Sequence, residues 1–319
     1  MTTDWRPSAS FEMLGLRAQV LRQIREFMAE HAILEVETPV LIHSAVSDPN
    51  IQSFSVGFHH PNQPDQKKLY LHTSPEYAMK RLLAAGSGPI YQIIRVFRDN
   101  ESGKLHNPEF SLLEWYQPYY DHHDLMDEAD ALLRKLDFKR TIRMSYSEVF
   151  EHHTGINPHQ TERMELQKIA KQAGLHTAAN DPSLLLDFIF SSKIAPNLGH
   201  DQPVFIYNYP ACLCALANLT NDDPPQAERF ELFISGVEIA NGFNELCDVT
   251  EQKHRFEREM QLRHQTGNTD HTIDQRLLDA MTSGLPECAG VAVGIDRLLM
   301  VMKGCDDINQ VIAFPVDRA

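Results

Sequence analysis

The sequence has few basic residues and no concentrated basic segment. Its 319 residues include 29 Lys and Arg against 44 Asp and Glu, which gives a formal net charge of −15, and no run of Lys or Arg is longer than two residues. Proteins usually bind nucleic acids through a basic face that releases counterions. The composition therefore disfavours a nucleic-acid-binding protein, and a tRNA partner in particular would need evidence of its own.

Long apolar runs, cysteine pairs and nucleotide-binding glycine loops are also lacking. No apolar run approaches the roughly 20 residues of a membrane helix, and the first residues lack the apolar core of a signal peptide, so we expect a cytoplasmic protein. The five cysteines include no CxxC pair, which argues against a disulfide framework or a structural zinc site. No GxxxxGK[ST] loop occurs, and Gly86-Ser87-Gly88 precedes a predicted strand, so neither common nucleotide-loop fold is supported.

Helix and strand patterns are both present, without regular alternation. Apolar spacing predicts an opening helix over residues 11–30 and a short helix over Ser74–Ala85, and residues 121–200 are predicted to be mainly helical. Residues 43–68 are predicted to be loop with a short hairpin. Strands are predicted over Ile33–Leu41, Leu69–Thr73, Ile90–Arg98, Glu109–Gln117, Val204–Tyr209, Arg229–Ser235 and Val237–Asn241. This arrangement favours a single α+β domain over residues 1–319, an antiparallel β-sheet flanked by helices.

Two local signals support these boundaries. Ser235-Gly236 separates two strand patterns as the turn of a hairpin does. Ser145 followed by Glu148 fits a helix capping box. We therefore expect a β-hairpin at the first position and a helix start at the second.

An arginine, an aromatic ring and several carboxylates concentrate in residues 97–116. The pattern predicts two strands, which contribute Phe97–Glu101 and His106–Tyr116 on either side of a polar loop. Phosphate groups suit the fork of an arginine, and a purine suits a flat partner. The segment therefore has the residue types that a nucleotide site needs.

These residues resemble the class II aminoacyl-tRNA synthetases. Arg98–Tyr116 is similar to their motif 2, Gly290–Leu298 to motif 3 and Glu37-Thr38-Pro39 to motif 1, in the order of the family. The segments similar to the lysyl subclass are Thr73–Tyr77, His106–Phe110 and Gly236–Gly242. The resemblance implies the class II catalytic core, the use of ATP with Mg²⁺, and a homodimer formed through motif 1.

Motif 1 begins at Glu37, whereas the tRNA enzymes of the family carry an anticodon-reading barrel before it. The resemblance, which runs from about Trp5 to Ala319, is therefore to the truncated bacterial lysyl-type enzymes that attach β-lysine to elongation factor P. It implies activation of (R)-β-lysine, and of α-lysine more weakly, as an adenylate. The acceptor that it implies is a lysine ε-amine of elongation factor P, and tRNA is disfavoured.

The resemblance also implies nucleotide contacts. Arg98 would grip the α-phosphate and the substrate carboxylate, and Arg297 would hold the γ-phosphate from the start of a helix over Asp296–Lys303, so these two are the candidate catalytic residues. Phe110 would stack on adenine. The other implied ATP-binding residues are Asp99, Asn100, Asn107, Glu238, Ile239 and Gly294. The alternatives are ion pairs for the arginines, a core position for Phe110 and a simple turn at Asn107-Pro108.

A magnesium site is predicted in the strand Val237–Asn241. Glu238 lies there between apolar neighbours, and an inward carboxylate would be costly without a cation. By the family pattern Glu231 is the second candidate ligand, with an exposed edge carboxylate as the alternative.

The predicted substrate carries two ammonium groups, and their burial requires separate anionic partners. By the lysyl pattern Glu245 and Tyr116 would hold the distal ammonium, and Glu76, in the segment Ser74-Pro75-Glu76, would face the proximal amine. The alternatives are a solvated loop acid for Glu245 and a helix N-terminal charge for Glu76.

Motif 3 departs from the lysyl pattern at the floor of the implied pocket. The lysyl enzymes usually read Gly-x-Gly-x-Gly, and the middle position here is Ala292. One methyl group would crowd an α-amine, whereas a β-amine is displaced by one carbon. This favours β-lysine over α-lysine.

Rival functions remain open at the level of sequence. The protein could be a free-standing adenylate-forming enzyme with another acceptor, a small molecule or a tRNA, as the ammonia-using asparagine synthetases are. Their aspartate pocket would need a cation where this chain has Glu245. A second rival is a non-catalytic regulatory paralogue. Loss of Arg98, Glu238 or Arg297 would have indicated such a protein, but all three residues are present.

Overall fold

A computed structural model describes residues 5–59, 67–176, 180–265 and 272–319, and the chain divides into two compact units. Unit 1 comprises Met1–Tyr119, Leu246–Glu287 and Ala292–Ala319, and unit 2 comprises Tyr120–Glu245 and Cys288–Val291. Both units combine helices with mainly antiparallel strands, which confirms the α+β prediction. Every helix within the described ranges is too short or too polar to cross a membrane.

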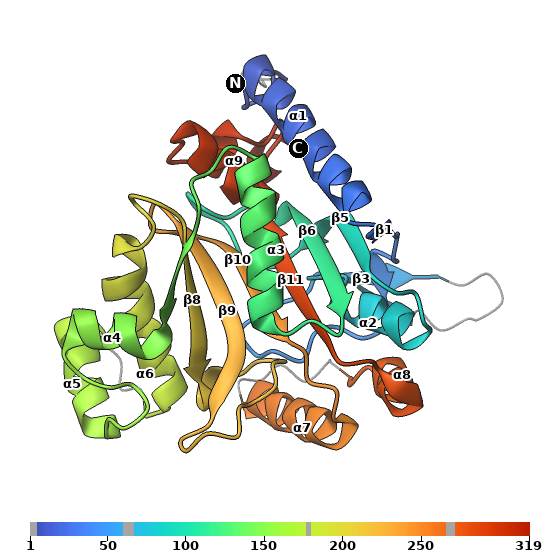
Figure 1. The fold of residues 1–319 in the computed structure, drawn as a ribbon. Coiled ribbons are helices and arrows are strands. Elements are labelled where there is room, and N and C mark those ends of the chain that lie inside the picture. Colours follow the sequence, from blue (N-terminus) through green and yellow to red (C-terminus); the bar gives the residue numbers. More distant parts are fainter. Residues whose placement is uncertain (1–4, 60–66, 177–179, 266–271) are drawn as a thin grey trace. The chain divides into compact units, whose positions relative to one another are not determined.

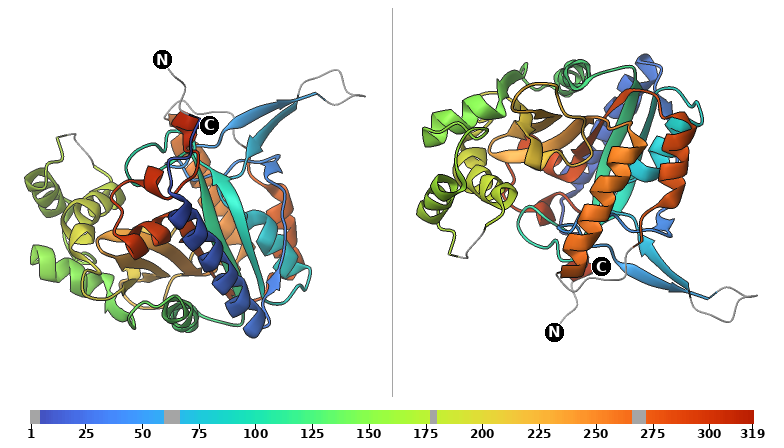
Figure 2. Two further views of the ribbon diagram at one scale, coloured as in Figure 1. Left: turned by 90° about the horizontal axis from the view of Figure 1, so that it is seen from above. Right: turned by 90° about the horizontal axis from the view of Figure 1, so that it is seen from below.

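Unit 1 holds a pair of long strands and a small separate sheet. Its helices are α1 (Phe11–Glu30), α2 (Glu76–Ala84), α7 (Val249–Gln265), α8 (Gln275–Gly284) and α9 (Ile295–Lys303). Its strands are β1 (Leu34–Glu35), β2 (Leu41–Ile42), β3 (Ser55–Phe58), β4 (Lys67–Leu71), β5 (Ile90–Phe97) and β6 (Glu109–Pro118). Strands β5 and β6 are antiparallel, with Ile90 opposite Tyr116 and Phe97 opposite Glu109. Strands β3 and β4 form a ribbon that projects from the other elements of unit 1 in both views of Figure 2.

The opening helix α1 matches its prediction. The Ser10 hydroxyl accepts a hydrogen bond from the backbone N–H of Met13 at 3.1 Å, which caps the first turn. Of the apolar residues whose spacing predicted the helix, Ile24, Phe27 and Met28 are buried, whereas Leu14 and Leu21 are half-buried. The helix ends at Glu30, so both of its boundaries were predictable from sequence.

The single strand predicted over Ile33–Leu41 is wrong. The structure has two short strands instead: β1 pairs in parallel with β5, and β2 pairs antiparallel with β4 in the smaller sheet. Pro39 lies between them and cannot donate a ladder hydrogen bond, so the chain leaves one sheet before it and joins the other after it. The hairpin predicted within residues 43–68 forms between β3 and β4, and residues 60–66 lie outside the described ranges.

Unit 2 is a sheet covered by helices. Its strands are β7 (Ile142–Ser145), β8 (Val204–Pro210), β9 (Gln226–Ile234) and β10 (Val237–Asn244). Its α-helices are α3 (His122–Lys135), α4 (Tyr146–Thr154), α5 (Arg163–Gln172) and α6 (Pro182–Ile189). Strands β8, β9 and β10 are antiparallel, and β7 runs parallel to β8. Strand β11 (Cys288–Gly294) begins in unit 2 and ends in unit 1.

Both local turn and cap signals are confirmed in unit 2. Ser235 and Gly236 have φ values of 52° and 77°, the left-handed pair that a tight hairpin turn requires. Ser145 and Glu148 form the predicted capping box at the start of α4. The mainly helical character of residues 121–200 is also confirmed, except for the short strand β7.

The helices α4, α5 and α6 group beside β8 in Figure 1 and build the core of unit 2. Tyr146 stacks on Phe150 and Phe190 with ring centroids 5.5 and 5.0 Å apart. Leu166, Leu186 and other apolar side chains complete this core. This core includes Ala227 and Phe233 of β9, the strand that carries Glu231 and pairs with β10, where Glu238 and Ile239 lie.

Candidate functional site

A buried carboxylate, Glu114, lies at the centre of the predicted amino-acid site in unit 1. Side chains alternate along a strand, so Phe110, Glu114 and Tyr116 of β6 project from one face. The Ser74 hydroxyl donates to Glu114 Oε2 at 2.8 Å, and the Tyr116 hydroxyl donates to Oε1 at 2.9 Å. Glu114 therefore joins two residues that the sequence assigned to the substrate. It was not itself among the predicted site residues.

Glu76 begins helix α2 beside this group. Its backbone N–H donates to the Ser74 hydroxyl at 3.0 Å, and its carboxylate accepts from the ammonium of Lys80 at 2.7 Å. The alternative reading of Glu76 as a helix N-terminal charge is compatible with its place, yet its partner is a buried lysine one turn away. Ser74, Glu76 and Tyr116, three of the residues predicted to bind the substrate, thus lie together around Glu114.

Burial dominates the ionisation of Glu114. Burial, together with the nearby carboxylate of Glu76, raises the pKa of this carboxyl to about 8. The hydrogen bonds from Ser74 and Tyr116 and the charge of Lys80 act in the opposite direction. The carboxyl is therefore largely protonated at neutral pH until a cation approaches it.

A pocket of about 480 Å³ in unit 1 is lined by the same segment. Its wall includes Ser74, Pro75 and Glu76, together with the cationic side chains of Arg81 and Arg276. The segment Ser74-Pro75-Glu76 thus borders open space, and Ser74 connects it to the buried Glu114. This volume is within the range of small-molecule sites.

Arg98 and Phe110 lie together at the adjoining ends of β5 and β6. The guanidinium of Arg98 lies 5.1 Å from the centroid of the Phe110 ring, and Nη1 is 3.4 Å from Glu101 Oε1. Arg98 Nε is buried and has no hydrogen-bond partner among the described residues. A buried cationic donor without a partner is costly, which is a feature of sites that receive an anion.

Asp99 and Asn100 follow Arg98 in a turn. The backbone N–H of Asp99 donates to the carbonyl of Gln52 at 2.8 Å, and Asn100 is exposed with a φ of 67°, a conformation that asparagine tolerates well. Asn107 is buried instead, and its amide bonds the carbonyl of Glu109 at 2.6 Å and the N–H of Val316 at 3.0 Å. These two hydrogen bonds of Asn107 fix the backbone at the end of the motif 2 loop.

Arg297 projects from the first turn of α9 toward the motif 2 loop. Its Nη2 is 2.6 Å from His106 Nε2, and its Nε donates to the carbonyl of Leu105 at 3.3 Å. Because a guanidinium only donates, His106 accepts through Nε2 and is neutral in this contact. Gly294 is the residue that precedes α9, and Ala292 is half-buried two residues earlier in β11. The start of the helix at Ile295 agrees with the predicted Asp296–Lys303.

In unit 2, Glu231 of β9 forms a close ion pair with Arg229. The guanidinium of Arg229 also lies 4.5 Å from the ring centroid of Tyr209. Burial raises the pKa of Glu231, Arg229 opposes this shift, and the carboxylate of Glu238 adds to it. The side chain of Glu231 is 16% exposed and charge-paired, so it is not the exposed edge carboxylate of the alternative reading.

Glu231 and Glu238 suit magnesium by the chemistry of their donors. Both supply hard oxygen ligands, and Mg²⁺ is usually held by one or two carboxylates together with substrate phosphates. Across the described part of the chain no three His, Cys, Asp or Glu side chains converge on one point. The pair therefore fits an ion that arrives with a nucleotide better than a permanent all-protein site, and such an ion would compete with Arg229 for Glu231.

The other two predicted residues of unit 2 are buried. Glu245 is 1% exposed, its N–H donates to the carbonyl of Cys288 at 2.9 Å, and its carbonyl accepts from the Asn218 amide at 3.0 Å. This excludes the alternative of a solvated loop acid. Ile239 is buried at the irregularity in the pairing of β10 with β9, between Glu238 and Ala240.

Comparison with known families places almost the whole chain in one family. The family described as tRNA synthetases class II (D, K and N) matches residues 2–318. The chain belongs to this family, as the three motifs indicated.

Curated relatives extend over the whole chain. A protein of Histophilus somni (strain 2336) is 47% identical, covering 100% of this chain and 99% of the relative. Proteins of Pasteurella multocida (strain Pm70) and Pectobacterium atrosepticum are 47% and 44% identical over 99% and 100% of this chain. All three are named elongation factor P–(R)-β-lysine ligase.

Proposed function

We propose that this protein is an ATP-dependent ligase that activates (R)-β-lysine, and α-lysine more weakly, as an adenylate and attaches it to a lysine ε-amine of elongation factor P. Similarity to relatives with this name over the whole chain supports the reaction and the acceptor. The structural observation that carries the proposal is the acidic cluster in which the buried Glu114 lies with Glu76 and Tyr116. The buried carboxyl group of Glu114 and the half-buried one of Glu76 favour a ligand that brings ammonium groups.

The acids take separate roles in this proposal. Glu76 faces the proximal amine, and Ser74 and Pro75 shape the wall beside it. Glu245 and Tyr116 hold the distal ammonium. Glu114, which the hydroxyls of Ser74 and Tyr116 orient, loses its proton when the substrate cation lies near, because an adjacent positive charge lowers a carboxyl pKa.

The nucleotide residues act by position and charge. Arg98 binds the α-phosphate and the substrate carboxylate through its guanidinium group. Its buried Nε, which has no hydrogen-bond partner among the described residues, supports this role. Phe110 stacks on adenine and Arg297 holds the γ-phosphate. The further proposed ATP contacts are Asp99, Asn100, Asn107, Glu238, Ile239 and Gly294. Glu231 and Glu238 hold Mg²⁺, which would neutralise phosphate charge.

The reaction needs no nucleophilic side chain. A carboxylate oxygen of β-lysine forms a bond to the α-phosphorus of ATP, and the bond to the leaving pyrophosphate breaks. The neutral ε-amine of the acceptor lysine then attacks the carbonyl carbon, AMP leaves with the electron pair, and the amine loses a proton to solvent. Arg98 stabilises the charge that gathers at phosphorus in the first step.

We also propose that residues 1–319 act as one catalytic domain, that the enzyme works in the cytoplasm as a homodimer formed through motif 1, and that tRNA is not its acceptor. The family match over residues 2–318 supports a single catalytic domain. The net charge of −15 is unfavourable for tRNA.

ATP–pyrophosphate exchange with a panel of amino acids tests the activation step. We expect exchange to be stimulated by (R)-β-lysine, more weakly by α-lysine, and not by aspartate. A preference for aspartate would point to the asparagine-synthetase type of rival. Exchange with none of the amino acids, in a protein that still binds ATP, would favour a regulatory paralogue.

A further inference from the structure

We infer that Asp296 is a positioning residue for the nucleotide contacts and that Arg17 is the counter-ion that fixes it. The inference rests on the proposed function, because Phe110 and Arg297 are its proposed ATP contacts. All the residues involved belong to unit 1. Neither Arg17 nor Asp296 carries a role in the reaction described above.

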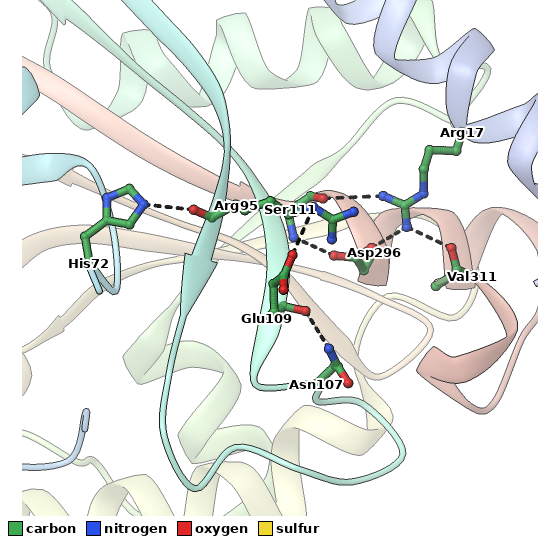
Figure 3. Close-up of polar contacts among 8 residues, drawn as sticks. All are labelled: Arg17, His72, Arg95, Asn107, Glu109, Ser111, Asp296 and Val311. Carbon is green, nitrogen blue, oxygen red and sulfur yellow. Dashed lines mark hydrogen bonds and ion pairs between the residues drawn. The ribbon is translucent and has the colours of Figure 1, made fainter. Parts of the chain in front are cut away.

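The carboxylate of Asp296 joins two separate elements. It is 2% exposed at the start of α9, and its Oδ2 accepts from the backbone N–H of Ser111 in β6 at 2.7 Å. Its Oδ1 forms a close ion pair with Arg17 of α1. Figure 3 shows Asp296 between Ser111 and Arg17, with each contact on a different side of the carboxylate.

Arg17 extends the connection to a third segment. Its side chain is 14% exposed, and the same Nη2 that meets Asp296 donates to the carbonyl of Val311 at 2.8 Å. Its Nη1 lies 3.5 Å from the Ser111 hydroxyl. One guanidinium from the opening helix thus contacts the strand, the helix and the segment that follows it (Figure 3).

The positions in the chain make these contacts relevant to ATP. Ser111 directly follows Phe110, and Asp296 directly precedes Arg297. The hydrogen bond from Ser111 to Asp296 therefore sets the distance between the proposed adenine platform and the proposed γ-phosphate arginine. Since Asp296 is buried, removal of Arg17 would leave its charge uncompensated, and the carboxylate would move toward other partners. This movement would loosen the Ser111 contact.

A purely structural ion pair would behave differently. It would contribute to stability, and its loss would not distinguish ATP from the amino acid. A positioning role predicts a selective change in the Michaelis constant for ATP, because the two residues that Asp296 fixes both belong to the nucleotide side. The split between the two Michaelis constants therefore separates the two explanations.

The test compares three full-length variants in pyrophosphate exchange, under conditions in which urea unfolding shows each to be folded. Arg17→Met removes the ion pair, and Arg17→Lys keeps the charge but cannot reproduce the fork. Arg22→Met is the matched control, because Arg22 lies on the same helix, its side chain is 71% exposed, and its ion-pair partner Glu26 is exposed as well.

For Arg17→Met we expect the Michaelis constant for ATP to rise about tenfold or more, while that for the amino acid changes by less than about twofold. Arg17→Lys should give a rise of about threefold, and Arg22→Met should match the wild type. If Arg17→Met does not fold, Arg17→Lys carries the test. Equal changes in both constants, or an unchanged constant for ATP in a destabilised variant, would overturn the inference. Absence of exchange in the wild type would instead refute the proposed function.

Discussion

Replacement of Glu114 by glutamine should change how the stability of the protein depends on pH. Glu114 is 2% exposed, and burial raises the pKa of its carboxyl to about 8 from the usual value of 4.5. Glutamine keeps the shape of the side chain and the carbonyl that accepts hydrogen bonds, but it cannot ionise. The variant therefore isolates the effect of one buried ionisation.

The direction and size follow from the two pKa values. Between pH 4.5 and about 8 the folded protein keeps a proton on Glu114 that the unfolded chain has lost. The folded state binds more protons in this window, so the free energy of unfolding contributed by Glu114 falls as the pH rises and levels off above the folded pKa. At about 1.4 kcal/mol per pH unit, the whole window corresponds to about 4 to 5 kcal/mol.

Urea unfolding without substrate, at one protein concentration and at several pH values from 5 to 9, measures this effect. The stability of the wild type relative to Glu114→Gln should fall steadily up to about pH 8 and then stay constant. Glu26→Gln is the control, since that carboxylate is 53% exposed on α1 and its removal should leave the pH profile nearly parallel to the wild type. A constant difference between wild type and Glu114→Gln across the range would show that the folded carboxyl is already ionised at low pH, which would refute the reasoning.

Three further substitutions test individual roles. Glu245→Gln should raise the Michaelis constant for the amino acid steeply, because breaking a buried ion pair costs about 3 to 5 kcal/mol. The Michaelis constant for ATP should stay nearly unchanged. If the dependence of exchange on amino-acid concentration is unaltered, Glu245 does not belong to the pocket. Ala292→Gly should raise the specificity constant for α-lysine relative to β-lysine by roughly 5- to 150-fold, since relief of one crowded methyl is worth about 1 to 3 kcal/mol. An unchanged ratio in a stable, active variant would show that Ala292 does not set the preference. Glu238→Gln should increase the Mg²⁺ concentration for half-maximal exchange, and an identical Mg²⁺ titration would contradict a ligand role.

The elements that were predicted correctly are those whose signals are local. The apolar stripe and cap of α1, the Ser235-Gly236 turn and the capping box of α4 each depend on residues a few positions apart. The errors involve pairing with distant segments. Residues 33–41 alternate as one strand would, but β1 and β2 pair with different partners, and β7 depends on a parallel neighbour that is far away in the sequence.

The same distinction applies to the site. The motifs identified Ser74, Glu76 and Tyr116, and the structure brings them together around Glu114. Glu114 could have been noticed, because it alternates with Tyr116 on a strand and its neighbours Leu113 and Trp115 are apolar or aromatic. Lys80 pairs with Glu76, and Arg229 pairs with Glu231. Both pairings depend on how deeply the side chains are buried and on the direction in which they point. Sequence spacing alone allowed these pairs but did not select them over solvent-exposed charges.

Mass spectrometry of the acceptor tests the central claim most directly. The full-length protein is incubated with ATP, (R)-β-lysine and elongation factor P, and lysine tRNA is tested as acceptor in a parallel reaction. We expect elongation factor P to gain the mass of one β-lysyl group on a single lysine, and tRNA to stay essentially uncharged. Efficient charging of tRNA, with no mass added to elongation factor P, would contradict it.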